Sequence, residues 1–269
     1  MRAPAELVVL IRGGGEMASA IAHRLHCSHF RVCLTETAMP LAVSRGTAFS
    51  EAVFDHTKTV DGETAELVPC SVTAIEQAWQ RGRIPILIDA GAAIKGELKP
   101  DIIVDARSLK VKSDTLITDA PLVIGLGPGF YAGRDCHAVI ETLHGHSLGR
   151  VILDGKTQED NRTPVDLGGL TKGRVVWAEG DGIFLTDHSI GSFVQAHEVV
   201  ATIGPHPIKA PVAGILRGLL RNGMRISQGA KVVEIDPVND SSACMAIRDK
   251  WRVVADGVLE AIMTKINEN

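Results

Sequence analysis

Apolar residues in the first half of the chain form short runs that alternate with stretches of helical spacing. The runs bounded by polar or turn residues predict strands at 7–11, 30–35, 84–89, 101–105, 121–124 and 150–154. Apolar positions spaced by three and four residues predict helices at 17–25, 71–81 and 135–143. Strands that alternate with helices favour an α/β fold, so we expect a Rossmann-like, doubly wound parallel sheet over residues 1–155.

The pattern changes in the second half of the chain to short strands and turns. Residues 156–173 are polar and aperiodic, which predicts a linker between two domains. Residues 174–269 then form an all-β domain that we expect to end in a helix over 253–266, where apolar residues recur at helical spacing.

The expected β domain contains an internal repeat. Segment 176–203 aligns without gaps on segment 208–235, at an offset of 32 residues that matches Gly182 with Gly214. Two copies of a four-strand unit predict a pseudo-symmetric module. The second copy resembles the biotinyl and lipoyl carrier fold, the barrel-sandwich hybrid, but the connection at 204–207 reads GPHP and lacks a lysine to modify. A structural or docking role is therefore expected rather than a swinging arm.

Composition narrows the classes of function. The formal net charge is -4 and aromatic residues make up 4% of the chain, which predicts no nucleic-acid or anionic membrane surface. The five cysteines lack C-x-x-C spacing, so neither a disulfide framework nor a zinc site is expected. No apolar run has the length of a membrane span, and the N-terminus does not read as a secretory leader. We expect a cytoplasmic protein.

The turn after the first predicted strand carries the first candidate chemistry. Gly13, Gly15 and Ala18 follow the spacing G-x-G-x-x-[GA], in which glycine backbone approaches a pyrophosphate at a helix N-terminus. Glu36 ends the second strand, where a carboxylate accepts a hydrogen bond from a ribose hydroxyl. The expected cofactor-binding residues here are Gly13, Gly14, Gly15, Glu16, Met17 and Glu36. The alternative is a turn that joins strand and helix without binding a ligand.

A second glycine-rich loop, at residues 125–133, follows the strand at 121–124. Its sequence, GLGPGFYAG, exposes backbone N–H groups and predicts a second anion cradle. We expect Gly127, Gly129 and Phe130 to contact the cofactor there.

The helix expected over 135–143 would begin with three chemically capable residues. Asp135, Cys136 and His137 are the candidate catalytic residues, because a helix N-terminus stabilises a thiolate and an imidazole accepts its proton. The alternative assigns Asp135 to a helix cap, Cys136 to the core and His137 to the surface.

Charged residues also follow two other strands of the first domain. Asp89 and Asp105 can bind ribose hydroxyls or an amine, and Arg107 can neutralise a phosphate or another oxyanion. Aspartates in such places equally often cap the following turn through backbone N–H groups. Both interpretations remain open from the sequence.

Four segments together resemble the family of selenium-dependent molybdenum hydroxylase system proteins, the YqeB group. They are residues 13–25, 45–55, 125–152 and 210–237, which start GGGEMASA, RGTAFSEA, GLGPGFYA and APVAGILR. The first domain is also distantly similar to XdhC-type proteins, which assist insertion of molybdenum cofactor. The resemblance implies an accessory protein in the maturation of a molybdenum hydroxylase. It implies a molybdopterin-type or other nucleotide-containing cofactor, and a hydroxylase apoenzyme as partner.

Two other functions stay open. A carboxylate at Glu36 is compatible with a small NAD(P)-dependent oxidoreductase, although the single tyrosine, Tyr131, has no lysine within helical reach. A non-catalytic docking module, in which the β repeat holds a partner enzyme, is the third possibility. Whether the chain is an enzyme is left undecided by its sequence.

Overall fold

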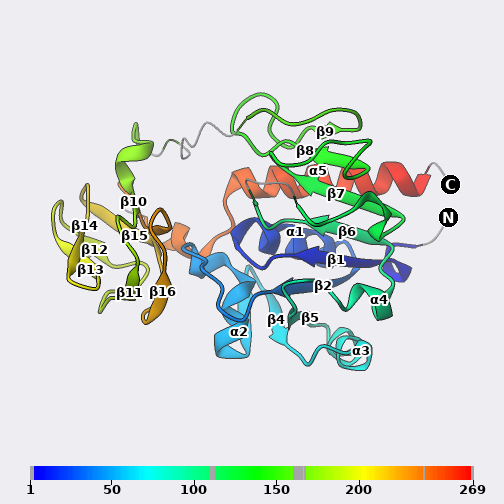
Figure 1. Ribbon diagram of the computed structural model, residues 1–269, viewed down its shortest axis with the longest axis horizontal. Coiled ribbons are helices and arrows are strands. Elements are labelled where there is room, and N and C mark those ends of the chain that lie inside the picture. The colour runs from blue at the N-terminus through cyan, green and yellow to red at the C-terminus, as the bar shows by residue number, and fades with distance from the viewer. Residues whose placement is uncertain (1–2, 110–112, 160–165, 167, 239, 268–269) are drawn as a thin grey trace. The chain divides into compact units, whose positions relative to one another are not determined.

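The computed structural model describes residues 3–109, 113–159, 166, 168–238 and 240–267 (Figure 1). Its contacts divide the chain into two compact units. The first unit comprises Met1–Pro40, Ala48–Asp160 and Ile247–Asn269, and the second comprises Leu41–Thr47 and Asn161–Ala246. Much of the linker expected over 156–173 lies outside the described residues.

One nine-stranded sheet dominates the described part of the first unit. Its strands follow the order β3-β4-β5-β2-β1-β6-β7-β8-β9. Their bounds are β1 Val8–Arg12, β2 Arg31–Glu36, β3 Thr57–Val60, β4 Glu63–Leu67, β5 Ile84–Ile88, β6 Ile102–Asp105, β7 Leu122–Leu126, β8 Ala138–Ile140 and β9 Val151–Ile152. Neighbours from β4 to β8 are parallel, whereas β3 and β9 pair antiparallel at the two edges.

Helices cover both faces of this sheet. Their bounds are α1 Glu16–Cys27, α2 Ala52–Asp55, α3 Val72–Gln80, α4 Lys95–Leu98 and α5 Asp249–Asn267. Apolar residues of α1 and α5 share one core with one face of the strands, and those of α3 share a second core with the other face. The C-terminal helix α5 packs along α1 (red and blue in Figure 1), so it belongs to the first unit and not to the β domain.

Local sequence explains the best-predicted elements. In β1 the residues after Val8 are all buried, as expected for a parallel strand covered on both faces. Ser71 caps α3 by accepting a hydrogen bond from the Ala74 N–H at 3.3 Å. Short 3-10 turns connect the larger elements, at Pro4–Glu6, Arg45–Thr47, Phe49–Glu51, Ile117–Asp119, Lys172–Arg174 and Ser242–Met245.

The expected Rossmann-like, doubly wound parallel sheet is contradicted. The sheet is mixed, because antiparallel strands form both of its edges. The helix expected over 135–143 is absent: this segment contributes β8, in which Ala138 pairs with Ile124 of β7. The buried β-branched residues Val139 and Ile140 fit a strand held between two neighbours, and this tertiary pairing overrides the helical spacing. The connection from β7 to β8 is a loop.

The second unit holds two four-stranded antiparallel sheets among its described residues, and it is not a clear barrel-sandwich hybrid, which corrects the expected class. The sheet orders are β10-β17-β15-β12 and β14-β13-β11-β16. The strands are β10 Val175–Trp177, β11 Gly182–Leu185, β12 Phe193–Val194, β13 Val199–Ile203, β14 His206–Lys209, β15 Gly214–Leu219, β16 Met224–Ile226 and β17 Lys231–Asp236.

The two sheets of the second unit reflect the sequence repeat. Each strand from β10 to β13 has a counterpart from β14 to β17 at the repeat offset, and exchanging counterparts turns one sheet order into the other. Gly182 and Gly214 begin the matching strands β11 and β15. Each sheet therefore combines strands from both copies: its two central strands come from one copy and its two outer strands from the other. In the described part of the chain, no helix combines the length and apolar character that a membrane span requires.

Candidate functional site

The direction in which strands are added to the sheet switches between β1 and β6. From β1 the chain continues to β2 on one side, and it later returns to β6 on the other side of β1. In open α/β sheets the loops at the carboxyl ends of strands diverge at such a switch of direction, which is where ligands bind. Arg12 and Asp105 end these two strands and lie opposite each other in register.

Arg12 is the unusual residue at this point, because its charged side chain is only 2% exposed. Its two terminal nitrogens donate to the two carboxylate oxygens of Asp114, each at 3.0 Å. Nη1 also donates to Thr115 Oγ1 at 2.6 Å, and Nη2 to the Ala90 carbonyl at 3.4 Å. A buried cation is stable only with such partners, so the contacts hold Arg12 in place.

Asp105 is the second buried charge, at 1% exposure. Its carboxylate accepts from Arg107 Nε at 3.0 Å and Nη2 at 2.6 Å. The hydroxyls of Ser113 and Thr115 donate to it at 2.7 and 2.6 Å. Burial raises the pKa of Asp105, but the hydrogen bonds from Arg107, Thr115 and Ser113 together lower this pKa below its ordinary value.

Asp114 connects the two arginines. Besides its bidentate pair with Arg12, it accepts from Arg107 Nη2 at 2.6 Å. Its side chain is 64% exposed, in contrast to the carboxylate of Asp105. Hydrogen bonds from Arg12, and then from Arg107, hold the pKa of Asp114 well below its usual range despite partial burial.

We call these residues the strand-end cluster: Arg12, Asp105, Arg107, Ser113, Asp114 and Thr115. The cluster holds two guanidinium groups against two carboxylates, one buried and one exposed. Planar guanidinium groups that converge on one carboxylate provide the fork geometry that recognises carboxylates and phosphates.

The glycine turn directly follows Arg12. Gly13 has φ +104°, a backbone conformation that favours glycine, and its N–H donates to the Thr35 carbonyl at 2.8 Å. The Gly14 N–H donates to Glu36 Oε2 at 2.8 Å, while Glu36 Oε1 accepts from the Thr37 N–H at 2.7 Å. Gly15 is the N-cap of α1, and a Cβ built on it would meet no atom within 4 Å. The turn therefore leaves open space at the start of α1.

Two expected cofactor residues have side chains engaged elsewhere. Glu16 forms an ion pair with Arg248 of the segment leading into α5, with 3.0 Å between Oε1 and Nε. Met17 is 6% exposed in the core beneath α1. Glu16 and Met17 therefore contribute only their backbone N–H groups to the site. N–H groups in the first turn of a helix have no acceptor within the helix.

In the second expected anion site, the loop at residues 125–133, the groups that were to contact the cofactor are engaged with the chain itself. The Gly127 N–H donates to the Ile140 carbonyl at 3.0 Å, and Phe130 is 6% exposed. The Phe130 ring packs over Gly125, where a Cβ would lie 2.4 Å from its Cγ. Gly129 has φ +110°, as a turn glycine requires. The loop thus places an aromatic ring in the core, and the glycine at 125 makes room for it.

The candidate catalytic residues lie in the loop that leads into β8, not at a helix start. Cys136 is buried at 0% exposure, and burial raises the pKa of its thiol to about 12. His137 Nδ1 accepts from the Val123 N–H at 3.0 Å, and burial, followed by the charge of Lys265, lowers the pKa of this imidazole. The helix field that was expected to stabilise a thiolate is missing, because β8 occupies this segment.

Asp135 and Asp89 both accept hydrogen bonds from backbone N–H groups close to them in the chain. Asp135 accepts from the Tyr131 N–H at 2.9 Å and pairs with Arg134, so it organises its own loop. Asp89 accepts from the N–H groups of Ala93 and Ile94 at 3.0 and 2.9 Å, which is the capping role. Asp105 differs from Asp89 because it is buried within an ion-pair network.

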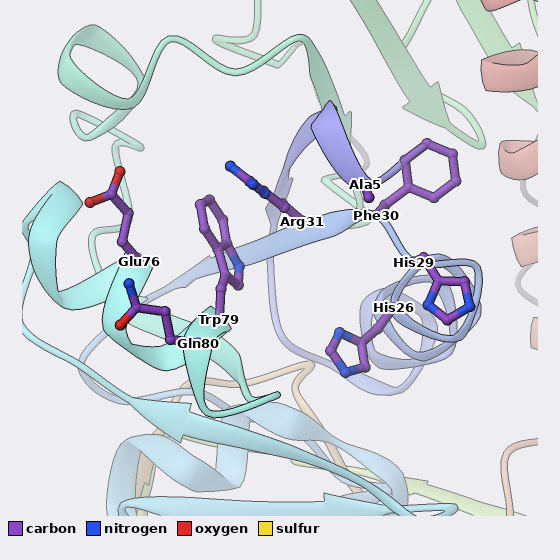
Figure 2. Close-up of a pocket in the computed structure, with 8 residues that line it drawn as sticks. All are labelled: Ala5, His26, His29, Phe30, Arg31, Glu76, Trp79 and Gln80. Carbon is purple, nitrogen blue, oxygen red and sulfur yellow. The ribbon is translucent and has the colours of Figure 1, made fainter. Parts of the chain in front are cut away.

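A hollow of about 630 Å³ lies away from these strand ends, at the start of β2. Figure 2 shows His26 and His29 at the end of α1 on one side, and Glu76, Trp79 and Gln80 of α3 on the other. The residues in it have partners within the chain: Trp79 Nε1 donates to the Val32 carbonyl at 2.7 Å, and Arg31 lies over the Trp79 ring at 6.0 Å. His26 pairs with Glu63 at 3.1 Å.

The described residues contain no group of three or more His, Cys, Asp and Glu side chains suited to a metal ion. The strand-end cluster brings four charged side chains, those of Arg12, Asp105, Arg107 and Asp114, together at the carboxyl ends of β1 and β6. Sequence reasoning identified Asp105 and Arg107 but missed Arg12, Ser113, Asp114 and Thr115. One signal was present: Arg12 places a charge at the end of an otherwise apolar strand.

Comparison with known proteins gives one sequence relative. The chain is 41% identical over 261 residues to YqeB of Escherichia coli strain K12, an uncharacterized protein. The match covers 97% of this chain but 48% of YqeB, so the chain spans about half the length of that relative. No family model matches the chain.

Among solved structures, the chain is similar to the ectoine utilization protein EutE (DoeB) from Ruegeria pomeroyi, with 14% identity and a TM-score of 0.27. It is also similar to a succinylglutamate desuccinylase from Silicibacter sp. TM1040, with 15% identity and a TM-score of 0.25. Both matches cover 85% of this chain and 84% of the other chain. Likenesses at this level decide neither fold nor activity.

The names of these solved structures differ from the molybdenum and selenium setting expected from the sequence. The solved structures are named for ectoine utilization and for desuccinylase and aspartoacylase proteins, and none of these names contains molybdenum or selenium. The coarser resemblance holds, since the chain is similar to YqeB over nearly all of its length. The expected partner enzyme remains a prediction.

Proposed function

We propose that the chain binds a small phosphate-bearing ligand of the nucleotide type at the carboxyl ends of β1 and β6. The observation that carries the proposal is the convergence of Arg12 and Arg107 on one carboxylate beside the glycine turn. A phosphate group can present a pair of its oxygens to each guanidinium edge in the same bidentate way as a carboxylate does.

The neighbouring backbone supports an anion at the same edge. α1 starts directly after the glycine turn, and the first N–H groups of a helix carry partial positive charge. The open space at Gly15 leaves room for a group to approach them. These two features favour a ligand that places one anionic group near the turn.

Glu36 supports a sugar-bearing ligand. Each of its carboxylate oxygens accepts one backbone N–H, from Gly14 and Thr37, and a carboxylate oxygen can accept two hydrogen bonds. A ribose hydroxyl can therefore donate to Glu36 while the glycine turn keeps its contact. A nucleoside phosphate combines this hydroxyl with the anionic group that the arginines select.

Calorimetric titration of the full chain with ADP, pyrophosphate and adenosine tests the proposal. We expect ADP and pyrophosphate to bind, adenosine to bind at least about tenfold more weakly than ADP, and both anions to bind more weakly at higher salt. Arg107→Lys keeps the charge but loses the fork, so it should weaken ADP binding about tenfold. Arg134→Lys is the matched control, because Arg134 is 68% exposed and pairs with Asp135. A folded wild type that binds neither anion at millimolar concentration contradicts the proposal.

A further inference from the structure

The two arginines of the strand-end cluster are occupied by the chain itself. Asp114 accepts three hydrogen bonds from guanidinium nitrogens, two from Arg12 and one from Arg107. These are the contacts that a bound oxyanion would make. Yet Asp114 is 64% exposed, whereas Arg12 is 2% exposed, so the acceptor lies at the surface and the donor below it.

Of the two carboxylates in the strand-end cluster, only that of Asp114 can move away from the arginines. Asp105 is 1% exposed and accepts from Arg107, Ser113 and Thr115, so its removal would strand buried donors. The carboxylate of Asp114 can move fully into water with little change in its own hydration, because most of its surface is already solvated.

The charge balance of the strand-end cluster requires the ligand to be an anion. With Asp114 in place, two cations face two anions. If Asp114 moves away, Arg12 and Arg107 face Asp105 alone, and one positive charge is uncompensated. Arg12 is too buried to gain solvent in exchange, so another oxyanion must replace the lost acceptor.

We propose that Asp114 is an internal stand-in for the ligand, whose carboxylate or phosphate group displaces it and takes over its contacts with Arg12 and Arg107. This inference rests on the proposed function and adds a regulatory consequence to it. The site is closed by its own carboxylate when empty, and apparent affinity is reduced by the fraction of molecules in which Asp114 occupies the arginines.

Removing this internal competitor should tighten binding. Asp114→Asn retains the size of the side chain but removes its charge, so we expect pyrophosphate and ADP to bind at least about tenfold more tightly than to the wild type. Asp114→Ser, which lacks the reach of an aspartate, should act in the same direction and serves as the second variant. Circular dichroism establishes that each variant is folded.

Asp119→Asn is the matched control. It removes one carboxylate a few residues further on, whose ion pair is with Lys95 at 2.7 Å and not with either arginine. Its affinity for both anions should equal that of the wild type. A general gain from lower negative charge would instead raise the affinity of all three variants equally, and that result would overturn the inference.

The remaining outcomes separate the inference from the proposed function. If the wild type and both Asp114 variants bind pyrophosphate equally well, the site binds anions but Asp114 is not displaced, and only the inference fails. If the folded wild type binds neither anion at millimolar concentration, the proposed function fails and the inference with it. If the Asp114 variants bind more weakly than the wild type, Asp114 supports the ligand, which also contradicts displacement.

Discussion

Replacing Asp105 by asparagine probes the ion-pair network on which the candidate site depends. The carboxylate is 1% exposed and accepts hydrogen bonds from the Arg107 guanidinium and from the hydroxyls of Ser113 and Thr115. Breaking a buried pair by removing one partner costs about 3–5 kcal/mol. Arg107 keeps its contact with the exposed Asp114, so we expect a loss near the lower end, about 3 kcal/mol in the free energy of unfolding.

The pH dependence of this loss is a second signature. The pKa of Asp105 is lowered in the folded chain, whereas an aspartate in an unfolded chain titrates near about 3.9. A lowered folded-state pKa contributes stability that is present above the unfolded value and is lost as the pH falls through the folded value. The difference between wild type and Asp105→Asn should therefore be full near neutral pH and shrink below about pH 4.

Urea unfolding followed by circular dichroism measures both effects. Asp119→Asn is the control, because its ion pair with Lys95 is partly exposed and should contribute about 1 kcal/mol or less. An equal loss in Asp105→Asn and the control would refute the reasoning, since burial would then add nothing. A difference from the wild type that stayed constant down to about pH 3 would refute the assigned pKa direction.

Two further predictions concern packing and thiol chemistry. Gly257→Ala should destabilise the chain by more than about 2 kcal/mol in the same unfolding assay, because a Cβ there would lie 2.1 Å from the Gly149 carbonyl oxygen and force α5 away. Cys136 should resist alkylation by iodoacetamide in the native chain while exposed Cys27 reacts, as mass spectrometry of digested peptides would show, since the Cys136 thiol is buried with a pKa raised to about 12.

Each of these predictions has a control within the same chain. Gly96→Ala meets open space in α4 and should be neutral, or stabilising by less than about 1 kcal/mol; a comparable loss at both glycines would contradict the packing argument. Cys70 is also exposed, so iodoacetamide should alkylate it as it alkylates Cys27. If Cys136 reacted as fast as Cys70, the segment around β8 would have to open readily, contrary to its burial.

Elements whose causes are local could be predicted from the amino-acid sequence alone. The apolar run before Arg12, the glycines after it and the spacing of α1 define one strand–turn–helix unit. The helix α3 and the repeat in the second unit could also be predicted, because capping, periodicity and matched glycines act within short stretches of sequence.

Features that depend on residues far apart in the chain could not be predicted in this way. Residues 135–143 have helical spacing, yet pairing with β7 makes a strand of Ala138–Ile140, and this removed the basis for a reactive Cys136. Arg12 and Asp114 are separated by 102 positions, and no local pattern shows that one neutralises the other. Charge pairing depends on position in space and on burial, which only the arrangement of β1 and β6 establishes.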